Sequence, residues 1–152
     1  LRAVGEGHVS SLTFRTGTIA ADGSLAVDPT ARLASSPRIV RQLSGESGEE
    51  VEVAFSKEQD ISERVIFPVT ESQSQGIEDA RFVEFSDAGQ KIYYATFTAY
   101  TGRTIRSALI ETRDFLSFRM SPLRGSAARN EGMALLPRKI DGKYAMIARQ
   151  DS

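Results

Sequence analysis

The sequence predicts an all-β fold, and three observations lead to that prediction. Apolar and polar residues alternate along several short segments that are rich in β-branched and aromatic residues, which is the pattern of half-buried strands. Pairs such as Asp-Gly, which favour tight turns, stand between many of these segments. No stretch keeps the apolar period of an α-helix over several turns, so no long amphipathic helix is expected.

The expected strands, in chain order, are residues 9–15, 64–69, 81–85, 91–100, 104–112, 133–136 and 143–149. Residues that tolerate a positive φ, and so favour tight turns, stand at Asp22-Gly23, Asp87-Ala88-Gly89, Thr101-Gly102 and Asp141-Gly142. We expect residues 56–62 to form one helical turn at most, and residues 114–118 to form a turn.

Two polar segments are expected to be solvated loops. Residues 42–62 are acidic and poor in aromatic residues, which is typical of a surface connection. Residues 121–132 are rich in Ser, Gly and Arg and are likewise expected to be irregular. Because loops often carry binding residues, the arginines of this second segment are candidates for a site.

A weak internal repeat bears on the architecture. A strand, a turn containing Asp and Gly, and a strand carrying tyrosine occur at residues 82–95 and again at residues 134–145. The two turns are separated by roughly 50 residues, a period that is typical of propeller blades. From composition alone, a β-propeller and a β-sandwich fit the sequence equally well.

Composition excludes several classes of function. A chain of 152 residues is long enough for one domain with an apolar core, and residues 1–152 are expected to form it. A net charge of −1 without a Lys/Arg cluster predicts no nucleic-acid partner. With no cysteine and one histidine, His8, neither a metal centre nor a Ser-His-Asp triad is expected.

The sequence also predicts no membrane association. No apolar run approaches the roughly 20 residues that span a bilayer. The first residues contain no apolar signal-peptide segment, and a cytoplasmic location is expected.

The most informative segment is Gly-Ile-Glu-Asp-Ala-Arg at residues 76–81, followed by a strand rich in tyrosine and threonine that ends at Tyr100. Sugar chemistry uses such a combination, because the acid transfers protons, aromatic rings stack on pyranose faces, and hydroxyl groups bond to sugar hydroxyls. The alternative is a structural hairpin with a surface glutamate and a buried Asp–Arg ion pair.

Further motifs follow in a defined order: Thr-x-Asp-Phe at residues 112–115, Arg-Asn at 129–130, Leu-Pro-x-Lys-Ile-Asp-Gly-Lys-Tyr at 136–144, and Arg149. Together with residues 76–81, this series resembles glycoside hydrolase family 130, the β-mannoside phosphorylases and their hydrolytic relatives. The resemblance extends from about Ser10 to Asp151. One departure is Ala80, where the family usually has proline.

The resemblance implies a five-bladed β-propeller, of which this chain would supply about three blades as part of a larger protein. It also implies an inverting reaction. Inverting hydrolases use two carboxyl groups, one as acid and one as base. A phosphorylase needs only the acid, because inorganic phosphate is already anionic, and it needs cations in place of the second carboxylate.

By resemblance, Asp79 is the catalytic proton donor. It must keep its proton near neutral pH, which requires burial or a neighbouring anion. Glu78 would point to the opposite face of an extended chain and contact sugar hydroxyls or a cation. Arg81 would project on the same side as Asp79 and contact the substrate or phosphate, or pair with Glu78.

Further binding residues are expected around this acid. Thr98 and Tyr100 share one face of their strand, and either could line the pocket; for Thr98, packing within the blade is the alternative. Arg15 would be another pocket cation. Arg129 and Arg149 would bind phosphate, because the planar guanidinium matches phosphate geometry. Asn130 would donate a hydrogen bond to a phosphate or sugar oxygen.

The sequence therefore predicts an inverting phosphorylase that acts on β-mannoside oligosaccharides. Inorganic phosphate is the co-substrate, and no metal or organic cofactor is implied. The alternatives are a β-mannoside hydrolase of the same family and a non-catalytic propeller module that binds glycans or a protein. Exposed blade edges would also allow pairing with a second copy of the chain.

Overall fold

The computed structural model describes residues 1–46, 48–87 and 89–149. These residues form thirteen strands and three 3-10 helices of three residues each, so the expected all-β class is confirmed. The short helices are η1 (Glu6–His8), η2 (Ile61–Glu63) and η3 (Glu71–Gln73). Among the described residues, no helix is long and apolar enough to cross a membrane.

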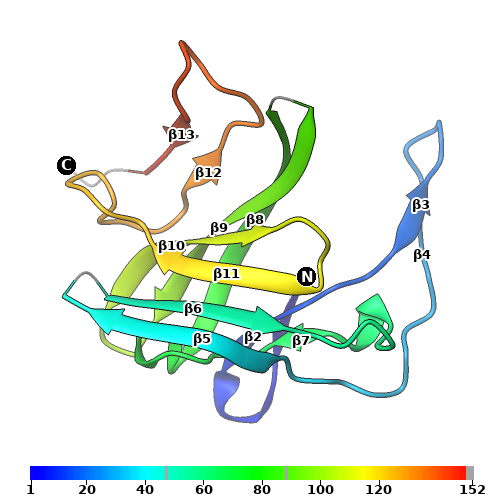
Figure 1. Cartoon of the computed structure of the whole chain (residues 1–152). Helices are drawn as coiled ribbons and strands as arrows, with labels where there is room; N and C mark the ends of the chain where they lie inside the picture. The colour runs from blue at the N-terminus through cyan, green and yellow to red at the C-terminus, as the bar shows by residue number, and fades with distance from the viewer. Residues whose placement is uncertain (47, 88, 150–152) are drawn as a thin grey trace.

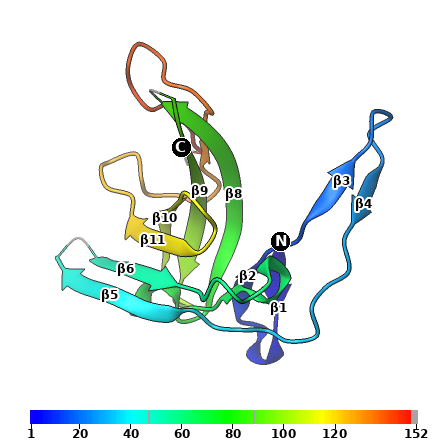
Figure 2. The same cartoon turned by 45° about the vertical axis from the view of Figure 1, so that its right-hand side comes forward.

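Nine strands form one curled sheet (Figures 1 and 2). Its order is β1 (Arg2–Val4), β2 (Ser10–Thr13), β8 (Gly76–Asp87), β9 (Gln90–Tyr100), β10 (Ile105–Thr112), β11 (Ser117–Pro122), β6 (Gly48–Ala54) and β5 (Arg38–Gly45), with β7 (Val65–Ile66) paired to β2. Strands β8 to β11 are an antiparallel meander, which is the construction of one propeller blade.

The main core lies on one face of this sheet, because alternate residues of neighbouring strands point to the same side. Its buried members are Leu12, Phe14, Val51, Val53, Phe55, Ile66, Ile77, Ala95, Phe97, Ala99, Ala108, Ile110, Phe118 and Met120. Most of them come from β6, β9, β10 and β11, so burial of this face holds the meander and the β5–β6 hairpin together.

The prediction of a solvated loop over residues 42–62 was wrong. Strands β5 and β6 lie there, and Val51 and Val53 are almost completely buried. Glu50 and Glu52 alternate with them on the other face, so the acidic composition of the segment belongs to the outer side of a strand.

The predicted turn at residues 114–118 and the predicted loop at residues 121–132 both extend into a strand that was not predicted. Strand β11 covers Ser117–Pro122, with Phe118 and Met120 in the core. The segment has no long apolar run, because every second residue faces outward.

Two hairpins stand apart from the sheet. Strands β3 (Gly17–Ile19) and β4 (Leu25–Val27) form an arm that projects from the body (Figures 1 and 2), and its turn is the predicted Asp22-Gly23. Strands β12 (Ala134–Leu135) and β13 (Met146–Ile147) form the second hairpin, as the repeat predicted. Ala88 of the turn predicted at 87–89 lies outside the described residues.

The second hairpin packs on the far end of β8 and β9. The ring of Tyr144 lies 5.1 Å from that of Phe85 and 6.0 Å from that of Tyr94. Phe85, Ile92 and Leu135 form a second buried cluster there. The repeat therefore corresponds to two hairpins that belong to different sheets and pack against each other.

Candidate active site

Asp79 lies at a β-bulge near the start of β8. Glu78 is opposite Thr98 of β9, whereas Arg81 is opposite Thr96, so β8 has one residue more than β9 between these pairs. Asp79 has a φ of 51°, in the left-handed region that few residues other than glycine adopt. A bulge turns side chains away from the regular alternation and is common beside functional sites.

Asp79 lines a cavity of about 540 Å³ between the β3–β4 arm and the sheet. Its lining combines three kinds of side chain. The charged ones are Arg2, Arg15 and Asp79; the aromatic ones are Phe14, Phe82 and Phe115; and the aliphatic ones of the arm are Ile19, Leu25 and Val27. A concave site with a few converging charges on a largely apolar wall is the usual form of a ligand pocket.

Arg2 links the two acids of the motif. Its Nη2 lies 3.2 Å from Oε1 of Glu78, and its Nη1 lies 3.8 Å from Oδ1 of Asp79. The hydroxyl of Ser10 also donates to Oε1 of Glu78 at 3.1 Å. Glu78 therefore pairs with a cation, which was one of the two roles expected for it.

The burial expected for Asp79 is absent. Its side chain is 49% exposed, and its neighbour is the cation Arg2. Arg2 was not predicted, because β1 has only three residues and is separated from β8 by β2 in the sheet.

Arg15 also lines the cavity. Its Nη1 donates to the carbonyl oxygens of Phe14 and of Ser62, the latter at 3.1 Å. Both acceptors are uncharged, so the positive charge of Arg15 is available to an anionic group in the cavity.

Arg81 does not lie on the side of Asp79, and that prediction was wrong. The bulge shifts the alternation, and Nη1 of Arg81 donates to the carbonyl of Met133 at 3.3 Å. Thr96 donates to the same carbonyl at 2.6 Å. Arg81 thus helps to hold the segment before β12 against the sheet.

Thr98 and Tyr100 share a face of β9, as expected, but the structure does not bring them to the cavity of Asp79. Thr98 is almost completely buried between Glu78 and Ser107 on the neighbouring strands. Tyr100 is half-buried at the end of β9.

The predicted phosphate ligands gather at a second place. The guanidinium of Arg149 pairs with the carboxylate of Glu131, and the side-chain amide of Asn130 donates to the carbonyl of Arg149 at 3.3 Å. Arg129 precedes Asn130 and is exposed. The residues that line the cavity of Asp79 include none of these predicted ligands.

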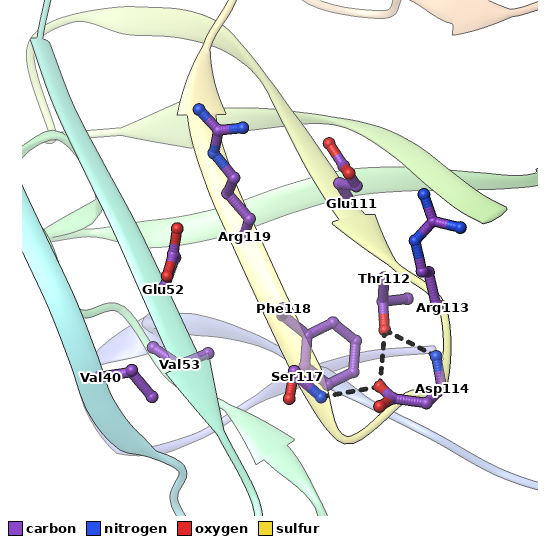
Figure 3. A pocket seen from close by; sticks show the side chains of 10 residues that line it. All are labelled: Val40, Glu52, Val53, Glu111, Thr112, Arg113, Asp114, Ser117, Phe118 and Arg119. Carbon is purple, nitrogen blue, oxygen red and sulfur yellow. Dashed lines mark hydrogen bonds between the residues drawn. The ribbon is translucent and has the colours of Figure 1, made fainter.

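A second cavity of about 290 Å³ lies on the outer face of β6, β10 and β11 (Figure 3). Glu52, Arg119 and Glu111 stand side by side there on adjacent strands. Arg119 is already engaged, because its Nη2 lies 3.1 Å from Oε2 of Glu50, and this bond raises its pKa.

Asp114 at the edge of this cavity is also engaged. Its carboxylate accepts a hydrogen bond from the backbone amide of Ser117 at 2.9 Å (Figure 3) and another from that of Leu116, also at 2.9 Å. Burial acts to raise the pKa of Asp114, but these amides and the Thr112 hydroxyl outweigh it and leave the pKa below its ordinary value. The described residues contain no cluster that could hold a metal ion. The cavity of Asp79 is therefore the stronger candidate site.

Comparison with known proteins identifies relatives. A model of glycoside hydrolase family 130, described as beta-1,4-mannooligosaccharide phosphorylase, matches residues 45–152. A beta-1,2-mannobiose phosphorylase of Listeria innocua serovar 6a is 33% identical over 86 residues, which are 55% of this chain and 22% of that protein. No solved structure matches the chain. The family match includes Asp79 and the cluster at Arg149 but not Arg2, Arg15 or the β3–β4 arm.

Proposed function

This chain belongs to glycoside hydrolase family 130, and from that premise we propose that the protein is an inverting phosphorylase of β-mannosides. The all-β curled sheet fits part of a five-bladed propeller, the fold of that family. The related protein from Listeria innocua acts on a mannobiose, which supports a mannoside substrate.

The observation that carries the proposal is the place of Asp79. It stands at a bulge, in a left-handed conformation, at the wall of a cavity that also contains two arginines. A carboxyl group and cations that face one concave surface are the groups that phosphorolysis requires.

In the proposed reaction, a phosphate oxygen attacks the anomeric carbon of the mannosyl group while the bond from that carbon to the leaving oxygen breaks. Asp79 supplies the proton that the leaving oxygen takes up. The bound sugar must first bury this carboxyl group, which is half-exposed beside Arg2, so that it holds a proton. Attack from the opposite side inverts the β configuration, so the products are α-mannose 1-phosphate and the released alcohol.

The positive charge that phosphate needs has two proposed sources. Arg15 lies in the cavity, with both acceptors of its hydrogen bonds uncharged. Arg129, Asn130 and Arg149 are proposed as further phosphate ligands from the family resemblance. For Arg149→Ala we expect a higher KM for phosphate and an unchanged KM for the mannoside, measured in the intact protein.

The test of the proposed reaction uses the intact protein with β-linked mannobiose, with and without phosphate. Formation of mannose 1-phosphate that depends on phosphate supports the proposal. Release of mannose at a rate that phosphate does not change would instead identify a hydrolase.

The role of Asp79 is tested by Asp79→Asn. We expect kcat to fall by about 10²–10⁴, because the amide cannot supply the proton. Asp141→Asn is the matched control, since Asp141 is also an exposed aspartate with a left-handed φ, of 50°, but lies outside the cavity. Equal rates for the two variants would remove Asp79 from the reaction.

A further inference from the structure

Two residues with unusual backbone conformation line the same cavity. Among the described residues, the non-glycine residues with positive φ are His8, Asp79, Phe115 and Asp141. Histidine and aspartate are tolerated in this region, whereas a bulky aromatic residue there is an outlier. Phe115, with a φ of 54°, must therefore be held in place by its surroundings.

Hydrogen bonds at both ends of the residue hold Phe115. Its backbone amide donates to the hydroxyl of Thr112 at 3.0 Å, and its carbonyl accepts from Nη1 of Arg64 at 2.9 Å. Arg64 is itself buried and donates from Nη2 to the carbonyl of Gln59 at 2.7 Å. The backbone of Phe115 is thus held by Thr112 at the end of β10 and by Arg64, which is distant in the chain, and this fixes the position of the ring.

This arrangement places the ring at the cavity wall. Phe115 and Phe82 both line the cavity, with ring centroids 5.9 Å apart and planes tilted by 34°. Phe82 is 39% exposed, and Phe115 is half-buried. Phe14 packs edge-on against both rings from the core side.

A pyranose ring has an apolar face of C–H groups, and aromatic rings bind such faces. In an inverting reaction on a β-mannoside, phosphate must approach the anomeric carbon from the face opposite the leaving oxygen. An aromatic wall over that face of the reacting sugar would block the attack. The leaving sugar forms and breaks no bond at its own ring carbons, so the wall can cover either of its faces.

We infer that Phe115 and Phe82 form the binding platform for the leaving sugar of the mannoside, and that Arg64 is the residue that positions Phe115. This inference rests on the proposed phosphorylase function. On the arm side of the cavity, Ile19, Leu25 and Val27 offer no hydrogen bonds, so the hydroxyl groups of this sugar face Arg2, Arg15 and Asp79.

The experiment compares Phe115→Leu with Phe118→Leu in the intact protein. Phe118 belongs to the same aromatic cluster, 6.3 Å from Phe115, but is fully buried and does not line the cavity. For Phe115→Leu we expect the KM for mannobiose to rise about fivefold, with kcat and the KM for phosphate unchanged. Phe115→Tyr keeps the ring and should keep the KM of the wild type, and Phe118→Leu should lower stability without changing KM.

A second substrate tests binding of the leaving sugar separately from binding in the rest of the pocket. β-Mannosyl fluoride carries no leaving sugar, so its KM should be the same for Phe115→Leu and the wild type. The inference is overturned if Phe115→Leu leaves the KM for mannobiose unchanged, raises the KM for the fluoride equally, or is matched by Phe118→Leu.

Failure of the proposed function can be told apart from failure of this inference. If the wild type turns over neither substrate, saturation-transfer NMR with mannobiose still measures binding. Loss of the sugar signals in Phe115→Leu but not in Phe118→Leu supports the platform, and equal signals in both variants overturn it.

Discussion

The residue after Asp79 is compatible with the backbone conformation at the bulge. A residue that precedes proline is disfavoured in the α region, so proline at position 80 would oppose the backbone conformation that Asp79 adopts. Ala80, the departure from the family pattern, places no such restriction on Asp79. The substitution and the left-handed φ of Asp79 are therefore compatible with each other.

Tyr94 provides a prediction about pH. Burial, and next the Tyr144 side chain beside it, raise the pKa of Tyr94 from 10.0 to about 12. The unfolded chain loses the Tyr94 proton near pH 10, whereas the folded chain keeps it to a higher pH. The contribution of Tyr94 to the free energy of unfolding is therefore complete below pH 10 and is lost as the pH rises towards about 12.

The measurement for Tyr94 is an ultraviolet titration of the phenol groups. Tyr144→Phe should lower the pKa of Tyr94 but leave it above 10, because burial remains. Tyr93→Phe is the control and should leave this transition in place, since Tyr93 bonds to Glu84 instead. An unchanged transition in Tyr144→Phe would contradict the assignment.

The candidate site could be predicted from sequence only where its residues stand together. Asp79 and Glu78 form a compact motif, and Arg15 ends a clear strand pattern, so all three were found. Arg2 and Phe115 reach the cavity from segments far from Asp79 in the chain, and no local pattern connects them. Arg81 was placed on the wrong side, because the alternation rule does not foresee an inserted bulge residue.

At the scale of elements, the long strands β8, β9 and β10 were predicted, because β-branched and aromatic residues are dense there. The missed strands β5, β6 and β11 mix charged, polar and small residues into positions that are not buried, such as Arg41, Glu52 and Ser117. The average composition of such segments is typical of a loop, although Val51, Val53 and Phe118 are almost completely buried.

Gly76 joins β2 to β8, and its replacement should weaken that junction. It pairs with Ser10 in parallel, has a φ of 147°, and an added Cβ would lie 3.0 Å from Cβ of Ser10. We expect Gly76→Ala to lower the free energy of unfolding by about 3 kcal/mol, measured by urea denaturation.

Gly142→Ala is the control for Gly76→Ala. Gly142 also has a positive φ, of 74°, but an added Cβ would meet nothing within 4 Å. Its replacement should lower the free energy of unfolding by only about 1 kcal/mol. A loss in Gly76→Ala no larger than this would show that the contact with Ser10 relaxes freely.

Arg64 connects the segment before β7 to the turn between β10 and β11. Arg64→Met leaves the carbonyls of Phe115 and Gln59 without their donor, and should lower the free energy of unfolding by about 3 kcal/mol. Nε of Arg64 has no acceptor among the described residues, so its removal loses no bond.

Arg113→Met is the matched substitution for Arg64→Met in the same denaturation experiment. Arg113 is exposed and bonds only to the side chain of Gln90 among the partners that the structure gives it. We expect a change within about 0.5 kcal/mol. Similar losses for both arginines would mean that the buried bonds of Arg64 add nothing.

At the scale of the whole molecule, the sheet ends in β1 on one side and β5 on the other. All residues of β5 are exposed, including the apolar Ile39, Val40 and Leu43. A long exposed edge strand is a template for pairing with another chain. We therefore expect this 152-residue chain to associate at high concentration, as sedimentation velocity would detect.

Leu43→Lys should reduce this association, because a charge on an edge strand opposes pairing, and Glu50 stands opposite position 43 to accommodate it. Val27→Lys removes an exposed apolar side chain from the β3–β4 arm instead and should have no effect. If Val27→Lys reduces the association and Leu43→Lys does not, the chains associate through the β3–β4 arm and not through β5.

The bulge at Asp79 also decides how the two apolar clusters share one strand. Before it, Ile77 faces the main cluster; after it, Phe85 faces the second cluster under β12 and β13, on the other side of the sheet. Deleting a single residue there would restore one regular alternation of side chains along β8. Either Ile77 or Phe85 would then face the wrong side of the sheet. The length of this segment is therefore fixed by packing on both surfaces, and a one-residue deletion should disrupt folding even if the carboxyl group were kept.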